Sequence, residues 1–231
     1  MSTTYYKEPR KSLRKQLVLL LRAVKNKILS YYYYTKKEEF TFHSHIYNYF
    51  FHNYNATWEN ERAVEIPIIL AALSSLKGKK ILEVGNVLQH YGFTGHDVVD
   101  KYEGGVNVLN SDIADFKPVQ KYDCIVSIST LEHVGWDEEP REPKKFNDAI
   151  RNISENCLAK GGTLIVTLPV GYNSYVDKYL AKQPSALGEL FFLKKVSKRI
   201  WEEVPYEKVR DTKYNYPFSA SNAICISFYI K

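Results

Sequence analysis

Cysteine and long apolar runs are both scarce in this chain of 231 residues. The three cysteines, Cys124, Cys157 and Cys225, form no C-x-x-C pair, so their spacing indicates neither a metal site nor a disulfide, and we expect buried thiols in a reducing compartment. The longest apolar run, Leu17 to Leu21, is far shorter than the roughly 20 residues of a membrane-spanning helix. The segment Lys7 to Lys15 is highly charged and no cleavage pattern follows it. We therefore expect no signal peptide and a cytoplasmic protein.

A glycine-rich phosphate loop is missing where the sequence would place one. Residues 79–84 read as a short buried strand, which carries Glu83 and leads into Gly85 and Asn86. A strand followed by a sharp glycine turn builds the nucleotide pocket of open α/β sheets. Val87 comes next, where a G-x-G-x-x-G loop would continue with the glycines that approach a pyrophosphate. The segment therefore favours a cofactor without phosphates.

Further short apolar segments follow at regular intervals. One ends at Asp100, and another is followed by Ser111 and Asp112. The stretches 122–129 and 163–169 are almost wholly apolar and rich in β-branched residues, as central parallel strands are. Residues 149–159 have a helical pattern, which we expect Lys160–Gly162 to stop. Alternating strands and helices predict a parallel sheet with right-handed crossovers.

With these motifs in order, the chain resembles the class I S-adenosylmethionine-dependent methyltransferases over about residues 60–231. The resemblance implies an α/β fold, with a Rossmann-like, doubly wound, mostly parallel seven-stranded sheet and an antiparallel last strand at residues 223–229. It implies S-adenosyl-L-methionine as cofactor, with Asp100 on the ribose and Asp112 and Ile113 at the adenine. The cofactor-binding residues expected at the strand ends are Glu83, Gly85, Asn86, Asp100, Asp112, Ile113 and Ser129.

Methyl transfer needs mainly the in-line positioning of the acceptor, because the sulfonium is already a strong methyl donor. His133, which follows the fourth strand, is the candidate general base for a hydroxyl acceptor, with Glu132 to orient it; a structural histidine is the alternative. Candidate substrate residues are Arg62, in the segment leading into the domain, Trp136 and Tyr172. Ser129 stands where metal-using relatives of this type carry an acid, so no metal is expected.

The acceptor is less well specified. We expect methyl transfer to an oxygen of a small molecule or of a glycan, including a lipid-linked sugar. The Glu-Val-Gly-Asn and Leu-Glu-His-Val-Gly-Trp segments look similar to methyltransferases that accompany glycan assembly. An RNA 2′-O-methyltransferase and a non-catalytic cofactor-binding regulator or scaffold stay open as alternatives. The Asn-Pro-Pro-Tyr signature is lacking, which disfavours methylation of DNA amino groups.

The positive charge is concentrated at the N-terminus. Residues 1–40 hold ten basic and three acidic side chains, whereas the whole chain has a net charge of +6. The apolar residues of 13–28 follow one helical stripe, and most of the basic residues lie opposite.

We expect an extension at 1–58 and a methyltransferase domain at 59–231. Residues 10–34 fit a peripheral contact with an anionic membrane surface, or a helix packed on its own domain. Nucleic acid is a disfavoured partner, since no recognised binding module is present. The oligomeric state is open.

Overall fold

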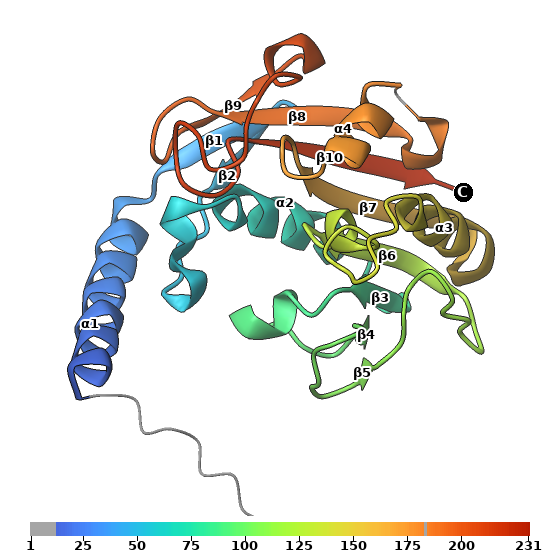
Figure 1. The fold of residues 1–231 in the computed structure, drawn as a ribbon, viewed down its shortest axis with the longest axis horizontal. Helices are drawn as coiled ribbons and strands as arrows, with labels where there is room; N and C mark the ends of the chain where they lie inside the picture. Colours follow the sequence, from blue (N-terminus) through green and yellow to red (C-terminus); the bar gives the residue numbers. More distant parts are fainter. Residues whose placement is uncertain (1–12, 183) are drawn as a thin grey trace, which may run out of the picture.

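The computed structural model describes residues 13–182 and 184–231 (Figure 1). Its centre is an eight-stranded sheet in the order β5-β4-β3-β6-β7-β10-β8-β9. The strands are β3 (Ile81–Val84), β4 (Asp97–Val99), β5 (Val108–Leu109), β6 (Tyr122–Ile128), β7 (Leu158–Pro169), β8 (Glu189–Lys195), β9 (Trp201–Val204) and β10 (Ala223–Ile230). Strands β3 to β7 are parallel, and β10 lies antiparallel between β7 and β8. The predicted Rossmann-like, mostly parallel sheet with an antiparallel last strand is confirmed.

The sheet has one strand more than the seven expected. Strand β9 pairs antiparallel with β8, and its register places Trp201 opposite Lys195. It is followed by the 3₁₀ turn η6 (Tyr206–Lys208). The side chain of Trp201 is buried, in a cluster with Leu193. The extra strand therefore covers the edge of β8 and adds an aromatic ring to the core.

Helices cover both faces of the sheet. Helix α2 (Arg62–Ser74) packs Ile66 and Ile69 against Val126 and Ile128 of β6 on one face. Helix α3 (Lys145–Asn152) packs against Ile125 and neighbouring residues on the other. Helix α4 (Ser174–Leu180) follows β7. Of the residues between β3 and β6, all of them described, only the 3₁₀ turn η2 (Leu88–Tyr91) is helical. Outside β4 and β5, this part of the chain therefore consists mostly of loops.

The predicted helix stop at Lys160–Gly162 was wrong. Helix α3 continues as the π-helical turn η4 (Ile153–Cys157), and β7 begins at Leu158. The glycines lie inside that strand, where the register with β6 jumps from Tyr122↔Leu158 to Cys124↔Thr163. Gly161 has φ +74°, a conformation that glycine adopts at little cost. The glycine pair thus forms a bulge in the sheet.

The N-terminal segment has two parts. Helix α1 (Leu13–Lys36) stands away from the sheet (Figure 1), and its end is held where Tyr33 packs on Trp58, with ring centroids 5.8 Å apart. The hairpin β1 (Glu39–Phe42) and β2 (His45–Asn48) buries Phe40 and Phe42 in one cluster with Trp58 and Ile224 of β10. Residues 39–58, assigned above to the extension, therefore share a core with the sheet. The boundary between residues 58 and 59 stays a prediction.

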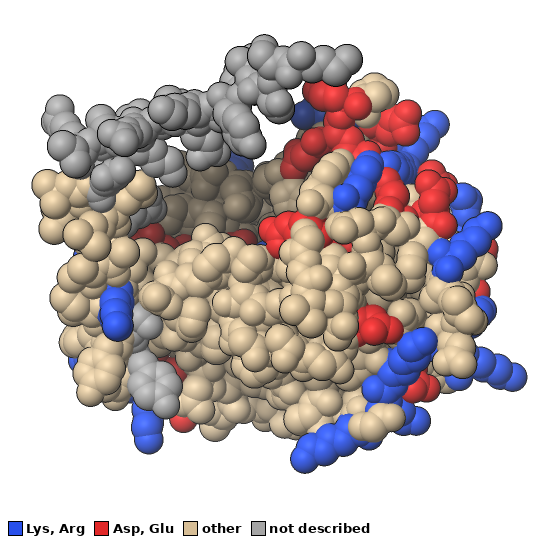
Figure 2. Space-filling model, turned by 90° about the horizontal axis from the view of Figure 1, so that it is seen from below, with Lys and Arg blue, Asp and Glu red and all other residues tan. Residues whose placement is uncertain are grey.

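The surface carries charges of both signs. On the face seen in Figure 2, basic and acidic side chains are interspersed along the right-hand side. Among residues 13–182 and 184–231, no helix has both the length and the apolar character that crossing a bilayer would require.

The three thiols are free and buried, as predicted. Cys124 lies in β6, Cys157 closes the π-helical turn and Cys225 lies in β10. Burial raises the pKa of Cys124 to about 12 and that of Cys157 to about 11. Each thiol is therefore protonated and unreactive in the folded protein.

Candidate cofactor and acceptor site

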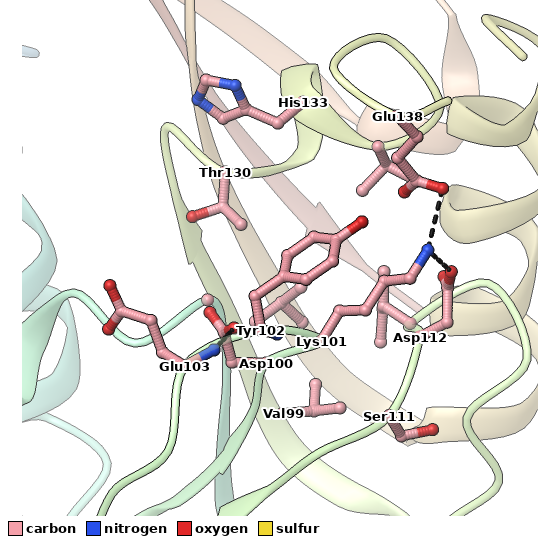
Figure 3. A pocket seen from close by; sticks show the side chains of 14 residues that line it. Val99, Asp100, Lys101, Tyr102, Glu103, Ser111, Asp112, Thr130, His133 and Glu138 are labelled. Carbon is pink, nitrogen blue, oxygen red and sulfur yellow. Dashed lines mark hydrogen bonds and ion pairs between the residues drawn. The ribbon is translucent and has the colours of Figure 1, made fainter. Parts of the chain in front are cut away.

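The candidate site lies at the carboxyl ends of the parallel strands. The chain moves outward from β3 to β4 and β5 and then returns to place β6 on the other side of β3. Such a switch point is where open α/β sheets bind ligands. A cavity of about 290 Å³ opens there (Figure 3). It is lined by Val84, Gly85, Val99, Asp100, Lys101, Tyr102, Glu103, Ser111, Asp112, Ile113, Thr130, His133, Val134 and Glu138.

Gly85 lets two strand ends approach each other closely. Its φ is +86°, and a Cβ atom added there would lie 2.3 Å from Oγ1 and 2.9 Å from Cβ of Thr130. Real Cβ atoms essentially never show such contacts. The predicted requirement for glycine after β3 therefore has two physical causes: the positive φ and the proximity of the segment after β6.

Asp100 joins the loops that follow β3 and β4. Its Oδ1 accepts hydrogen bonds from the backbone N–H groups of Tyr102 and Glu103, at 2.8 and 2.7 Å. Its Oδ2 accepts one from the N–H of Asn86 at 3.2 Å. A carboxylate has about four acceptor sites, so Asp100, which also lines the cavity, keeps capacity to accept a bond from a ligand hydroxyl.

A network of four charged side chains closes one end of the cavity. Lys101 Nζ lies 2.9 Å from Asp112 Oδ2 and 2.8 Å from Glu138 Oε2 (Figure 3). Lys145 Nζ lies 2.5 and 2.6 Å from the same two oxygens. Although partial burial raises the pKa of both carboxyls, the hydrogen bonds from the two lysines bring each pKa below its ordinary value. Two cations thus balance two anions.

The sequence prediction missed Lys101, Lys145 and Glu138. Lys101 could have been found, because it directly follows Asp100 at a strand end. The other two had no such signal: Lys145 begins α3, and Glu138 lies in the loop after the 3₁₀ turn η3 (Leu131–His133).

Of the predicted cofactor residues, Gly85, Asp100, Asp112 and Ile113 line the cavity, whereas Glu83, Asn86 and Ser129 do not. The side chains of these three residues make hydrogen bonds to other parts of the protein instead.

Glu83 is fully buried; its Oε1 accepts from the N–H groups of Val87 and Leu88, and its Oε2 lies 2.8 Å from His96 Nε2. Asn86 donates from Nδ2 to Glu103 Oε2 at 3.3 Å. Glu83 therefore stabilises the turn after β3 through hydrogen bonds to its backbone. A direct contact between Glu83 and a cofactor stays a prediction.

Ser129, at the end of β6, has φ +39° and donates its hydroxyl to Glu65 Oε1 at 2.5 Å. A serine in this region of backbone space is held there by its surroundings. The hydroxyl points to α2 and not into the cavity, and a cofactor role for Ser129 stays a prediction.

His133 meets two other side chains at the mouth of the cavity. Its Nδ1 lies 2.5 Å from Asp137 Oδ2, and the Tyr172 hydroxyl donates to the same oxygen at 2.5 Å. Burial alone would raise the pKa of Asp137, but the hydrogen bonds from His133 and Tyr172 lower it overall. The structure therefore brings together the predicted base and Tyr172, a predicted substrate residue. Asp137, which the sequence prediction missed, is placed to orient the imidazole.

Glu132 faces the interior. Its side chain is 2% exposed, and its Oε1 lies 3.5 Å from His133 Nε2. Arg62, a predicted substrate residue, forms an ion pair with Glu65 beside it. Trp136, also a predicted substrate residue, lies under the guanidinium of Arg141, 4.5 Å from the ring centroid, and is not part of the cavity wall. The substrate roles of all three stay predictions.

The lining residues fit S-adenosyl-L-methionine. Val84, Val99 and Ile113 give the cavity apolar walls suited to a purine. Asp100 can accept a ribose hydroxyl, and Asp112 and Glu138 supply acceptors for an exocyclic amine. The Oδ1 of Asn86 is buried without a hydrogen-bond partner among the described residues. Asn86 is outside the cavity wall, so this oxygen belongs to the turn after β3 and is not part of the fit to the cofactor.

Comparison with known proteins gives likeness in fold. No protein-family model matches the chain, and no curated protein matches it in sequence. The N-methyltransferase NodS from Bradyrhizobium japonicum WM9, in complex with S-adenosyl-L-homocysteine, is 14% identical, with 75% of this chain and 89% of that chain covered and a TM-score of 0.48. The 1,6-didemethyltoxoflavin-N1-methyltransferase from Burkholderia thailandensis is 11% identical, with 97% and 93% covered and a TM-score of 0.43. TehB from Haemophilus influenzae is 15% identical, with 78% and 64% covered and a TM-score of 0.43. At these identities the likeness concerns the arrangement of strands and helices alone.

Proposed function

We propose that this protein is a class I S-adenosylmethionine-dependent methyltransferase that acts on a hydroxyl of a small molecule or glycan. The observation that carries the proposal is Asp100. This carboxylate lines a cavity at the sheet's switch point, keeps acceptor capacity for a ribose, and stands beside a glycine turn that has no phosphate loop. At the far wall of the same cavity lies His133 with Asp137.

The bound cofactor would supply an activated methyl group, and the residues of this chain would position the acceptor and remove its proton. His133 is partly exposed at the cavity mouth and its Nδ1 contacts Asp137. This arrangement leaves Nε2 to take a proton from an acceptor hydroxyl, with Asp137 and Tyr172 holding the ring. The RNA 2′-O-methyltransferase and the non-catalytic regulator remain alternatives, which the presence and the acceptor of methyl transfer would separate.

Ligand-dependent melting tests the cofactor assignment. S-adenosyl-L-homocysteine at a hundred times its dissociation constant should add about 2.7 kcal/mol to the free energy of unfolding. NAD⁺ serves as the matched control, because its pyrophosphate needs the glycine-rich loop that this chain lacks. If NAD⁺ stabilises the protein and S-adenosyl-L-homocysteine does not, the proposal is wrong.

We further propose that α1 binds an anionic membrane surface. Its residues Leu17 to Leu21, Val24 and Ile28 are all at least half exposed, and Lys25 and Lys27 are exposed too. Where α1 joins the body, a cavity of about 370 Å³ is lined by Leu29 and Tyr33 together with Lys198 and Arg199. Apolar side chains beside cations suit an interface with anionic head groups, where each cation contributes about 1 kcal/mol.

Sedimentation with vesicles tests this surface. The protein should bind phosphatidylcholine vesicles that contain phosphatidylserine, and high salt should release it. The double variant Leu20→Glu/Leu21→Glu should lose binding while keeping its melting temperature, since both residues are exposed. Val119→Glu, a fully exposed position in a loop, is the control. Equal binding by both variants, or no binding by the natural protein at low salt, would refute the membrane proposal.

A further inference from the structure

Behind His133 lies a buried group of charges that is not balanced. Glu61 and Glu65 at the start of α2 and Glu132 in η3 supply three carboxylates. The exposed fractions of these three residues, backbone included, are 8%, 0% and 1%. Arg62 lies within this group and forms an ion pair with Glu65. A second cation, the buried Lys195, is near Glu61: burial lowers the pKa of Lys195, and Glu61 partly opposes that effect. Glu65 also accepts the Ser129 hydroxyl, and Glu61 accepts the N–H of Ser221 at 3.1 Å.

Glu132 has one carboxyl oxygen without a partner. Its Oε2 is buried and has no hydrogen-bond partner among the described residues, and its Oε1 lies 3.5 Å from His133 Nε2. Burial raises the pKa of Glu132 well above its ordinary value, and burial followed by the nearby Glu65 raises that of Glu61. An unsatisfied buried polar oxygen is costly and calls for a missing donor.

Aromatic rings lie beside this group. Tyr172 packs edge-on against both His133 and Tyr214, with ring centroids 5.0 Å apart in each case. Tyr214 is close enough to Glu132 and Glu61 for both to raise its pKa, after the larger effect of its own burial. Carboxyl groups near aromatic rings form an environment that favours an organic cation.

From this arrangement we infer that the methyl acceptor is an amino alcohol, whose protonated amine is bound by Glu132 and whose neighbouring hydroxyl meets His133. The inference rests on the proposed function and names its substrate class. Glu132 Oε1 and His133 Nε2 are 3.5 Å apart, so groups on adjacent carbons of one acceptor can reach both. The ammonium approaches Glu132 from the side of Oε1, because Oε2 is buried, and its charge favours the ionised form of a carboxyl that burial otherwise keeps protonated. In this role Glu132 binds the acceptor, whereas the sequence suggested that it orients His133.

Three matched two-carbon probes test the inference. Ethanolamine carries an ammonium and a hydroxyl, ethylene glycol carries two hydroxyls, and glycolate carries a carboxylate and a hydroxyl. Ligand-observed NMR and melting curves of the full-length protein, with and without S-adenosyl-L-homocysteine, should show binding of ethanolamine alone. Glu132→Gln should weaken this binding about tenfold or more, because a hydrogen bond to a charged group is lost. Glu142→Gln, at an exposed position, should not.

The outcomes separate this inference from the proposed function. If the protein binds S-adenosyl-L-homocysteine but binds ethanolamine no better than ethylene glycol or glycolate, the amino alcohol is excluded and the methyltransferase proposal stands. Unchanged ethanolamine binding in Glu132→Gln would also overturn the inference. Glutamine is close in shape to a protonated glutamate, so this variant should fold, and its melting temperature provides the check.

Discussion

Two groups of charged side chains accompany the site, one in the cavity wall and one behind His133, and they differ in how their charges are balanced. On the cofactor side, Lys101 and Lys145 face Asp112 and Glu138 in a balanced, partly exposed network. On the acceptor side, three buried carboxyl groups lie around Arg62, with Lys195 near one of them, Glu61. A balanced network fixes side chains in place without attracting further charge, whereas an unbalanced buried group favours the arrival of a cation.

Removing Asp100 should affect the cofactor side most. Asp100→Ala deletes the proposed ribose contacts, each about 1.5–3 kcal/mol, so affinity for S-adenosyl-L-homocysteine should fall about 100-fold or more. It also frees the N–H groups of Tyr102, Glu103 and Asn86. Calorimetry gives the affinity, and denaturation separates the loss of stability. Asp115→Ala is the control, since Asp115 lies outside the cavity wall. Natural affinity in Asp100→Ala would remove the main support for the cofactor site.

Changing His133 should act on the acceptor side alone. His133→Ala should lower the rate of methyl transfer to a hydroxyl about 10²–10⁴-fold, the usual loss for a general base. Affinity for S-adenosyl-L-homocysteine should stay the same. Asp137→Asn should lower the rate less, because the amide oxygen can still accept a bond from the imidazole. Initial rates and calorimetry on the same preparations measure both quantities, and an unchanged rate in His133→Ala would mean that the histidine is structural.

A pair of glycines tests the close approach of the strand ends. Gly85→Ala and Gly92→Ala share nearly the same φ, +86° and +85°, but only the first would place its new Cβ against Thr130. Both should lose about 1–2 kcal/mol through backbone strain, and Gly85→Ala should lose about 1–3 kcal/mol more through crowding. Urea denaturation measures the difference. Adding Thr130→Gly should restore part of the stability of Gly85→Ala, and equal losses in the two single variants would contradict the predicted clash.

The pH dependence of stability should distinguish the unbalanced side from the balanced one. The pKa of Glu132 is raised in the folded protein, well above 4.5, so folding favours the protonated carboxyl. Stability is then lost as the pH rises toward the folded pKa, by at most about 1.4 kcal/mol per pH unit. Glu132→Gln should lack this loss and be more stable than the natural protein at alkaline pH. If the free energies of unfolding of the two proteins, measured by denaturation at each pH, differ by the same amount from acid to alkaline pH, the pKa of Glu132 is not raised.

Local patterns in the sequence were enough to predict the strand ends that line the cavity. Gly85, Asp100, Asp112 and His133 each follow a short apolar segment, and parallel strands bring their carboxyl ends to one edge. The charge group behind His133 was beyond such reasoning, because Glu61 and Glu132 come together only through packing between distant segments. Arg62, which was selected as a substrate residue, pairs with Glu65 three positions along α2, a spacing that the sequence does show.

Where the sequence prediction failed, tertiary context overrode a local preference. A pair of glycines such as Gly161–Gly162 is typical of a helix end, yet here it lies in a β-bulge. The helix ends earlier, at Cys157, and β7 begins at Leu158; both residues are buried in the core. The extension at residues 1–58 stays a prediction. The packing of residues 39–58 against β10 is visible only in three dimensions.

The three buried thiols can be used to measure local opening of the protein. Cys124, Cys157 and Cys225 sit in three different elements, and no substitution is needed to place a probe there. An alkylating reagent can reach each one only when that element opens, so the three labelling rates give three local opening free energies. Cys124 lies in β6, the strand that leads into the 3₁₀ turn with His133. If ligand binding makes the site more rigid, labelling of Cys124 should slow more than labelling of Cys225.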